Sequence, residues 1–180
     1  MSTVEALSYA IDDRDRLIKL DEGYYRFAEE NGWDRVSDSL GRSLWDFVAG
    51  DEMRKVQRML LRRLRDEARE VELPFRCDSP GVRREMDMRI VSHPSGRTVL
   101  FSARLSAEHS RELDQPVLDL SAPRGEETLE MCGWCDRFLV DGEWMEIEEA
   151  AIALDLFRRS ELPRIDHGIC PRCSSMLLAA

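Results

Sequence analysis

The sequence has no long hydrophobic run. Charged side chains interrupt every apolar stretch well before the ~20 residues that a membrane-spanning helix requires. The first ten residues also lack the basic segment and apolar stretch of a secretory signal. We therefore expect a cytoplasmic protein that neither enters a membrane nor is secreted.

Basic residues are also in short supply. The chain has 26 Lys and Arg against 36 Asp and Glu, a net charge of −10, and residues 116–180 alone carry 6 basic and 13 acidic side chains. Because nonspecific affinity for nucleic acid depends on Lys and Arg, we expect no nucleic-acid partner. The imbalance weakens the alternative of a nucleic-acid-binding zinc module.

Catalytic patterns are missing as well. No Gly-rich loop leads into a Lys-Ser or Lys-Thr pair, and no serine or cysteine nucleophile has a clear base. Of the three histidines, His93 falls in a turn and His109 at the start of a linker, so neither is an evident haem ligand. We expect no enzyme.

Cysteine is scarce but patterned. Cys77 stands alone, whereas Cys132 and Cys135 form one pair two residues apart and Cys170 and Cys173 form another. In a reducing compartment such pairs indicate metal or redox chemistry rather than structural disulfides. Four sulfurs suit tetrahedral Zn²⁺ and leave no open position for a catalytic water, so the pattern predicts a structural zinc site.

His167, three residues before Cys170, is an alternative ligand or a hydrogen-bonding neighbour of the cysteines. Since four cysteines already complete the zinc shell, we expect the second role or a merely structural one. For Cys77, on a predicted strand, we expect a small buried apolar residue rather than a cofactor attachment.

The first hundred residues alternate between strand and helix patterns. Apolar alternation predicts strands at 7–11 and 17–20, and Asp21 is the expected cap of a short helix that ends at Asn31-Gly32. A second helical piece follows Ser43, and Asp51 is the expected cap of a longer amphipathic helix. Period-two patterns then predict three antiparallel strands within 71–105.

This layout, with Tyr24 to Gly32 and the run Gly41-Arg42-Ser43-Leu44-Trp45-Asp46-Phe47, resembles a PAS domain over residues 1–107. The resemblance implies an antiparallel sheet with flanking helices and a small-molecule cavity inside it, with an unknown ligand or none. Plain core packing remains the alternative. The candidate cavity residues are Trp45, Phe47, Met59, Phe75, Met88 and Phe101.

Residues 108–128 carry proline, glycine and many acids without periodicity, and we expect a partly docked linker. Residues 129–180 then read as a cysteine knuckle, a hairpin around Asp141-Gly142, a helix over about 148–159 and a final helix headed by the second cysteine pair. This order is similar to a treble-clef zinc fold. The expected fold class is therefore α+β, a PAS-like domain followed by a small zinc module.

The motif from Cys132-Gly133-Trp134-Cys135 to His167-Gly168-Ile169-Cys170-Pro171-Arg172-Cys173 resembles a cysteine-rich tail of bacterial PAS proteins, sensor kinases and response regulators. The resemblance implies a sensory or adaptor protein in signal transduction. Its partner would be a kinase, another regulator or a second copy of the chain in a homodimer. The alternative is a thiol redox or zinc-release sensor that acts through the four cysteines.

Overall fold

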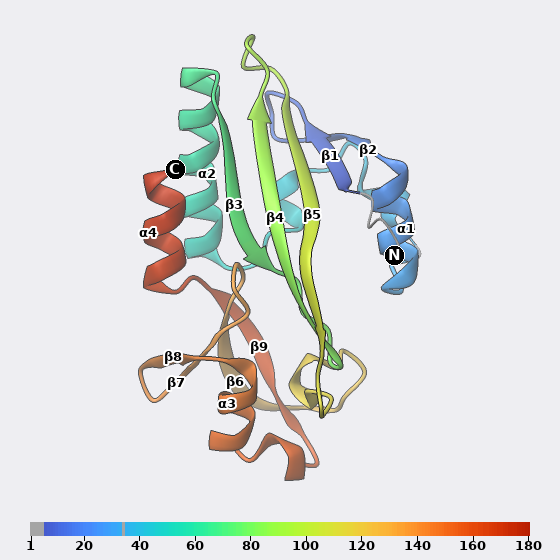
Figure 1. Cartoon of the computed structure of the whole chain (residues 1–180), viewed down its shortest axis with the longest axis vertical. Coiled ribbons are helices and arrows are strands. Elements are labelled where there is room, and N and C mark those ends of the chain that lie inside the picture. The colour runs from blue at the N-terminus through green and yellow to red at the C-terminus, as the bar shows by residue number, and fades with distance from the viewer. Residues whose placement is uncertain (1–5, 34) are drawn as a thin grey trace.

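The computed structural model describes residues 6–33 and 35–180. The first five residues and Asp34 of the predicted PAS domain lie outside the described part. The fold is mixed α+β, as expected, with a five-stranded antiparallel sheet above a smaller four-stranded sheet (Figure 1). Within the described residues no helix is both long and apolar enough to cross a membrane.

The larger sheet is built from strands at both ends of the first hundred residues. Its order is β2-β1-β5-β4-β3, and every neighbouring pair is antiparallel. The predicted strands are all present, and the last three are longer than expected. Their bounds are β1 Leu7–Ile11, β2 Leu17–Leu20, β3 Glu70–Arg76, β4 Val82–Ser92 and β5 Val99–Ser110.

Helices connect β2 to β3. Helix α1 spans Glu22–Glu30, and the Asp21 side chain caps it by accepting a hydrogen bond from the Tyr24 amide, as predicted. Two 3₁₀ turns follow, η1 (Val36–Ser39) and η2 (Leu44–Asp46). Helix α2 (Asp51–Glu67) buries an apolar stripe with helical spacing, which consists of Met53, Val56, Leu60, Leu61 and Leu64.

The start of α2 differs from the expectation. Asp51 is the first helical residue, and Gly50 takes the cap position with a φ of 82°. A Cβ at Gly50 would lie 2.0 Å from the carbonyl oxygen of His167, so only glycine fits both the backbone angle and the contact. This close approach ties α2 to a strand more than a hundred residues away.

The smaller sheet has the order β8-β7-β6-β9. Strands β6 (Arg124–Cys132) and β9 (Leu162–Gly168) run parallel, while β7 (Phe138–Val140) and β8 (Glu143–Met145) form the predicted hairpin. The helix expected over 148–159 is shorter, α3 (Ile147–Ala153), because Asp155 adopts a left-handed conformation before the 3₁₀ turn η4 (Leu156–Arg158). Helix α4 (Pro171–Ala179) ends the chain.

Residues 108–128 contain more regular structure than a linker. They include the end of β5, the 3₁₀ turn η3 (Pro116–Leu118) and the start of β6. Val117 is fully buried among side chains of the smaller sheet, whereas Leu120 is 92% exposed. The connection therefore packs against the core of the smaller sheet, where Leu118 and Ala122 are also partly buried.

Two main apolar cores result, and their boundary does not follow the two sheets. One core belongs to the smaller sheet and includes Leu129, Phe138 and Ile147. The other joins the larger sheet and α2 to Cys132, Cys170 and Leu177 of the C-terminal part. Helix α4 accordingly lies beside α2, away from its own sheet (Figure 1).

Candidate metal centre

The first cysteine pair lies in a tight turn between β6 and β7. The amide of Cys132 donates to the carbonyl of Arg137, and the amide of Asp136 donates to the carbonyl of Cys132. Asp136 closes the turn with a φ of 58°. The sulfur of Cys132 accepts from the amide of Trp134 in this turn and from the amide of Cys170 in the second pair, and the sulfur of Cys135 accepts from the amide of Arg137.

The second pair lies where β9 ends and α4 begins. Cys170 is the N-cap residue of α4, and its sulfur accepts a hydrogen bond from the amide of Cys173 at 3.4 Å. Pro171 occupies the first helical turn, where no amide donor is required. The free amides and the helix dipole at this end favour a negatively charged sulfur.

Parallel pairing of β6 with β9 brings the two pairs together. Cys132 lies opposite Gly168 in the register, and the Gly133 amide donates to the Gly168 carbonyl. The four sulfurs all lie within 4.8 Å of one another, and those of Cys135 and Cys170 are 3.8 Å apart. The structure therefore assembles the four predicted cysteines into one group that could hold a metal ion.

The donor set fits one tetrahedral cation. A tetrahedron with Zn–S bonds of ~2.3 Å has edges of ~3.8 Å, which matches the distance between the sulfurs of Cys135 and Cys170. Three of the four cysteines are buried and Cys135 is half-buried. Four protein ligands complete such a shell, so it would have no position for substrate or water.

The thiols depend on one another electrostatically. Hydrogen bonds from Cys135 and Cys173 lower the pKa of Cys132, and the same contact with Cys132 raises the pKa of Cys173. The thiols of the group therefore do not titrate independently of one another. A cation that replaces the protons lets all four ionise, and its binding releases protons.

Trp134, between the two cysteines of the first pair, joins the turn to the larger sheet. Its indole Nε1 donates to the carbonyl of Pro74 at 2.7 Å, and its own carbonyl accepts from the amide of Arg76 at 3.0 Å. Its ring lies 5.9 Å from that of Phe75. Since Pro74 and Phe75 belong to the edge strand β3, the cysteine turn covers that edge.

Buried charges hold the same junction together. Arg76 on β3 contacts Asp78 and Glu146, and Glu146 also bonds Arg137 at 2.8 Å and Arg83 at 3.3 Å. Burial opposes ionisation of Glu146, but the Arg137 hydrogen bond and the Arg76 charge outweigh it, so the pKa of Glu146 is lowered. The two parts of the chain are thus joined by ion pairs in which Arg76 is buried and Glu146 is partly exposed to water.

Asp78 lies at the centre of this junction. Its carboxylate is fully buried, and Arg111 contacts both Asp78 and Glu148. The backbone amide of Asp78 donates to the carboxyl of Asp136 at 3.0 Å. Burial raises the pKa of Asp136 to about 7.

His167 lies beside the cysteine group without joining it. Among the described residues, the group with metal-ligand geometry consists of cysteines alone. The His167 ring lies next to Gly133, and burial lowers the pKa of His167. No described cysteine sulfur accepts a hydrogen bond from its ring.

The fifth cysteine is remote from the group. Cys77 is half-buried beyond the end of β3, and burial raises the pKa of its thiol to about 11. A thiol held protonated in this way is a poor nucleophile.

Two pockets lie between the larger sheet and its helices, and we call them the α2 lobe and the α1 lobe. The α2 lobe, of about 180 Å³, includes Gln57, Ile90 and Trp134 in its lining, and the α1 lobe, of about 220 Å³, includes Tyr24 and Trp33. Both lobes share Tyr9, Phe75 and Met88. Phe101 stacks on Tyr9 at 4.5 Å between ring centres and lines the α2 lobe.

The structure places the other three predicted cavity residues outside both lobes. Trp45 donates to Asp15 and carries Arg58 over its ring. Phe47 contacts Trp33 and Arg42. Met59 is 45% exposed on the outer side of α2.

Sequence reasoning missed several residues of these sites. Tyr9 occupies a position in the apolar pattern of a strand, and Tyr24 occupies one in that of a helix, and both patterns predict side chains that face the protein interior. An aromatic residue at such a position is a usable signal for a cavity lining. In the sequence, Trp134 stands out only as part of a cysteine motif. The charged residues of the junction had no sequence signal, since their partners lie up to 70 positions away.

No protein-family model matches the sequence, and neither does any curated protein. The chemistry of the site therefore stands on the residues alone.

Proposed function

We propose that this chain is a cytoplasmic sensory or adaptor protein of bacterial signal transduction, with a PAS domain tied to a structural zinc module. Two strands, short helices, one longer helix and three strands that close a single antiparallel sheet support the PAS assignment. The two pockets between sheet and helices support a sensing role for that domain.

The observation that carries the proposal is the cysteine group itself. Its four sulfurs lie within 4.8 Å of one another, and its residues share a core with α2 and the larger sheet. Zinc is the best match because it prefers four-coordinate thiolate shells and needs no open position in structural sites. Such an ion would fix the second region against the first without taking part in catalysis.

A signal from this protein would leave through a protein contact. The partner is a second copy of the chain, a kinase or another regulator, and neither a membrane nor a nucleic acid belongs to the scheme. Sedimentation velocity of the zinc-loaded chain tests the first choice. A concentration-dependent dimer supports self-association, and a monomer throughout the micromolar range contradicts it.

One observation favours the alternative, a thiol redox or zinc-release sensor. Cys135 is half-buried and, with Cys173, lines a cleft of about 350 Å³ between the two regions, where an oxidant can reach the sulfur. Oxidation of a ligand thiolate would release the ion.

Treatment with mild peroxide separates the adaptor proposal from the redox-sensor alternative. Zinc content, thiol titration and amide hydrogen exchange are measured before and after the treatment. The adaptor proposal predicts retained zinc, four unreactive thiols and unchanged protection throughout 124–180. Loss of zinc with collapse of that protection would overturn it in favour of the redox sensor.

A further inference from the structure

The α1 lobe has the features of a ligand site. It lies between α1 and the larger sheet, with a volume of about 220 Å³. Its rings form a continuous series, because Tyr9 meets Tyr24 edge-on at 5.8 Å and Tyr24 meets Trp33 in the same way at 6.2 Å. Aromatic edges and faces arranged in this way receive another flat ring well.

Among the described residues, no charged side chain lines this lobe. Its lining is mainly apolar, and the lining residues that carry a polar side-chain group are Tyr9, Tyr24, Cys77, Trp33 and Asn31. Burial raises the pKa of both tyrosines and of the cysteine, so all three stay protonated at neutral pH. An ion that entered would lose its hydration without gaining an opposite charge, so the lining disfavours charged molecules.

The two hydroxyls have unused hydrogen-bonding capacity. No described residue is hydrogen bonded to the hydroxyl of Tyr9 or of Tyr24, whereas Asn31 already donates to the Phe27 carbonyl. An acceptor on a ligand could therefore take a hydrogen bond from either hydroxyl.

Size limits the ligand further. An apolar cavity of ~150 Å³ is enough to bind benzene, and drug-sized ligands occupy sites of roughly 300 Å³ or more. The α1 lobe lies between these limits, which corresponds to one or two fused rings.

We propose that the α1 lobe binds a small, uncharged, flat aromatic molecule that carries one hydrogen-bond acceptor. The inference rests on the proposed sensory function for its biological meaning and names the chemical class of the signal. The ligand proposal does not depend on the metal, so the ligand proposal and the zinc proposal can fail separately.

Three probes of nearly one shape test the class on the zinc-loaded full chain. Quinoline is uncharged at neutral pH and offers a ring nitrogen as acceptor, naphthalene lacks the acceptor, and N-methylquinolinium carries a fixed positive charge. Titration followed by protein-observed NMR should give the tightest binding for quinoline. Naphthalene should bind roughly fivefold to tenfold more weakly, the value of one hydrogen bond, and the cation should not bind measurably.

Variants locate the binding. Ala103 is buried in the wall of the lobe, so Ala103→Leu should fill it and abolish quinoline binding. Ala107→Leu, four residues further along β5 and outside the lobe, is the matched control and should bind normally. Tyr24→Phe keeps the ring and removes a hydroxyl, and it should lower quinoline affinity towards that of naphthalene.

Tyr24→Phe also keeps the test decisive if Ala103→Leu fails to fold. Equal affinity for the cation and quinoline, or quinoline binding unchanged in both Ala103→Leu and Tyr24→Phe, would overturn the inference. So would the absence of binding by all three probes at millimolar concentration. If zinc is meanwhile bound and retained under peroxide, the proposed function survives and only the ligand class is wrong.

Discussion

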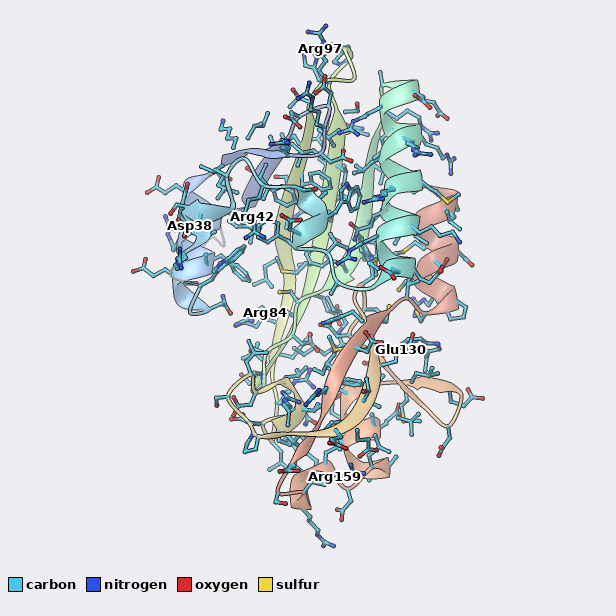
Figure 2. The ribbon with its side chains drawn as sticks, turned by 180° about the vertical axis from the view of Figure 1, so that it is seen from behind. Asp38, Arg42, Arg84, Arg97, Glu130 and Arg159 are labelled. Carbon is cyan, nitrogen blue, oxygen red and sulfur yellow. The ribbon has the colours of Figure 1, made fainter. Side chains whose placement is uncertain are left out.

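The two regions of the molecule are stabilised in different ways. The larger sheet with α2 buries a continuous apolar core in which the side chains alternate with the strand and helix periods. The region from β6 onward has a smaller core of its own, and it contains four cysteines, far apart in sequence, that form a group able to hold a metal ion. Figure 2 shows Arg97 at the free tip of the β4–β5 hairpin, Glu130 on β6 near the junction and Arg159 at the opposite end.

The comparison becomes informative at the junction. The cysteines belong to the core of the larger sheet rather than to that of their own sheet. The two regions are connected by Trp134, by the Gly50 contact and by the ion pairs of Arg76 with Glu146 and of Arg111 with Glu148. The centre therefore fastens one region to the other, and changes there should destabilise both.

The largest effect should follow loss of a metal ligand. Cys170→Ser removes one sulfur from the shell, so we expect loss of the ion and unfolding of β6 to α4, since structural zinc contributes roughly 10 kcal/mol or more to folding in small domains. Metal analysis and thermal unfolding measure both. Cys77→Ser is the matched control, because Cys77 lies outside the group, and it should keep its zinc and its unfolding midpoint.

Trp134→Ala should have the next largest effect. It removes a 6%-exposed ring, its contact with Phe75 and the hydrogen bond to Pro74, and we expect a loss of about 3–5 kcal/mol. Trp134→Phe keeps a ring without the hydrogen bond. Its unfolding free energy in denaturant titrations should lie between those of the wild type and Trp134→Ala. A single unchanged transition for Trp134→Ala would show that the turn does not join the regions.

Two glycines with almost the same backbone angle allow a controlled test of the Gly50 contact. Gly50 and Gly41 have φ values of 82° and 80°, but only a Cβ at Gly50 meets another atom, the His167 carbonyl. Gly41→Ala should cost about 1–2 kcal/mol for its positive φ alone. Gly50→Ala should cost about 1–3 kcal/mol more, from the overlap and from a ψ of 126° that lies outside the left-handed helical region. Equal losses in chemical denaturation would argue against close contact of α2 with β9.

A smaller effect is expected from Glu146→Gln, which weakens the pairing with Arg76 and Arg137. We expect about 1–2 kcal/mol at neutral pH, the scale of one charge-assisted hydrogen bond. Because the folded pKa of Glu146 is lowered, its contribution is full above the ordinary value of 4.5 and is lost as the pH falls through the folded value.

The difference in unfolding free energy between wild type and Glu146→Gln should therefore shrink on acidification. Glu143→Gln, at an exposed position of β8 three residues before Glu146, should show no such trend. A difference that stays constant with pH would contradict the role given to Glu146.

Local periodicity explains what could be predicted from the sequence. Strands β1 to β5, α1, α2 and the β7–β8 hairpin follow from apolar spacing and turn residues that act over a few positions. The grouping of the four cysteines followed from the chemistry of their spacing.

What escaped prediction depends on distant contacts. Strand β9 mixes Arg164, Asp166 and His167 among its apolar residues, and it pairs in parallel with β6 some forty residues earlier. Gly50 replaced Asp51 as the cap of α2 because of a contact with that same strand. In both cases tertiary packing overrode a local signal.

X-ray absorption at the zinc edge, on protein purified without added metal and paired with a metal-to-protein ratio, tests the central claim most directly. The account predicts one zinc per chain with four sulfur neighbours at ~2.3 Å and no nitrogen or oxygen neighbour. A shell that includes a nitrogen or oxygen ligand, or a chain that contains no zinc and has its cysteines in disulfides, would contradict it.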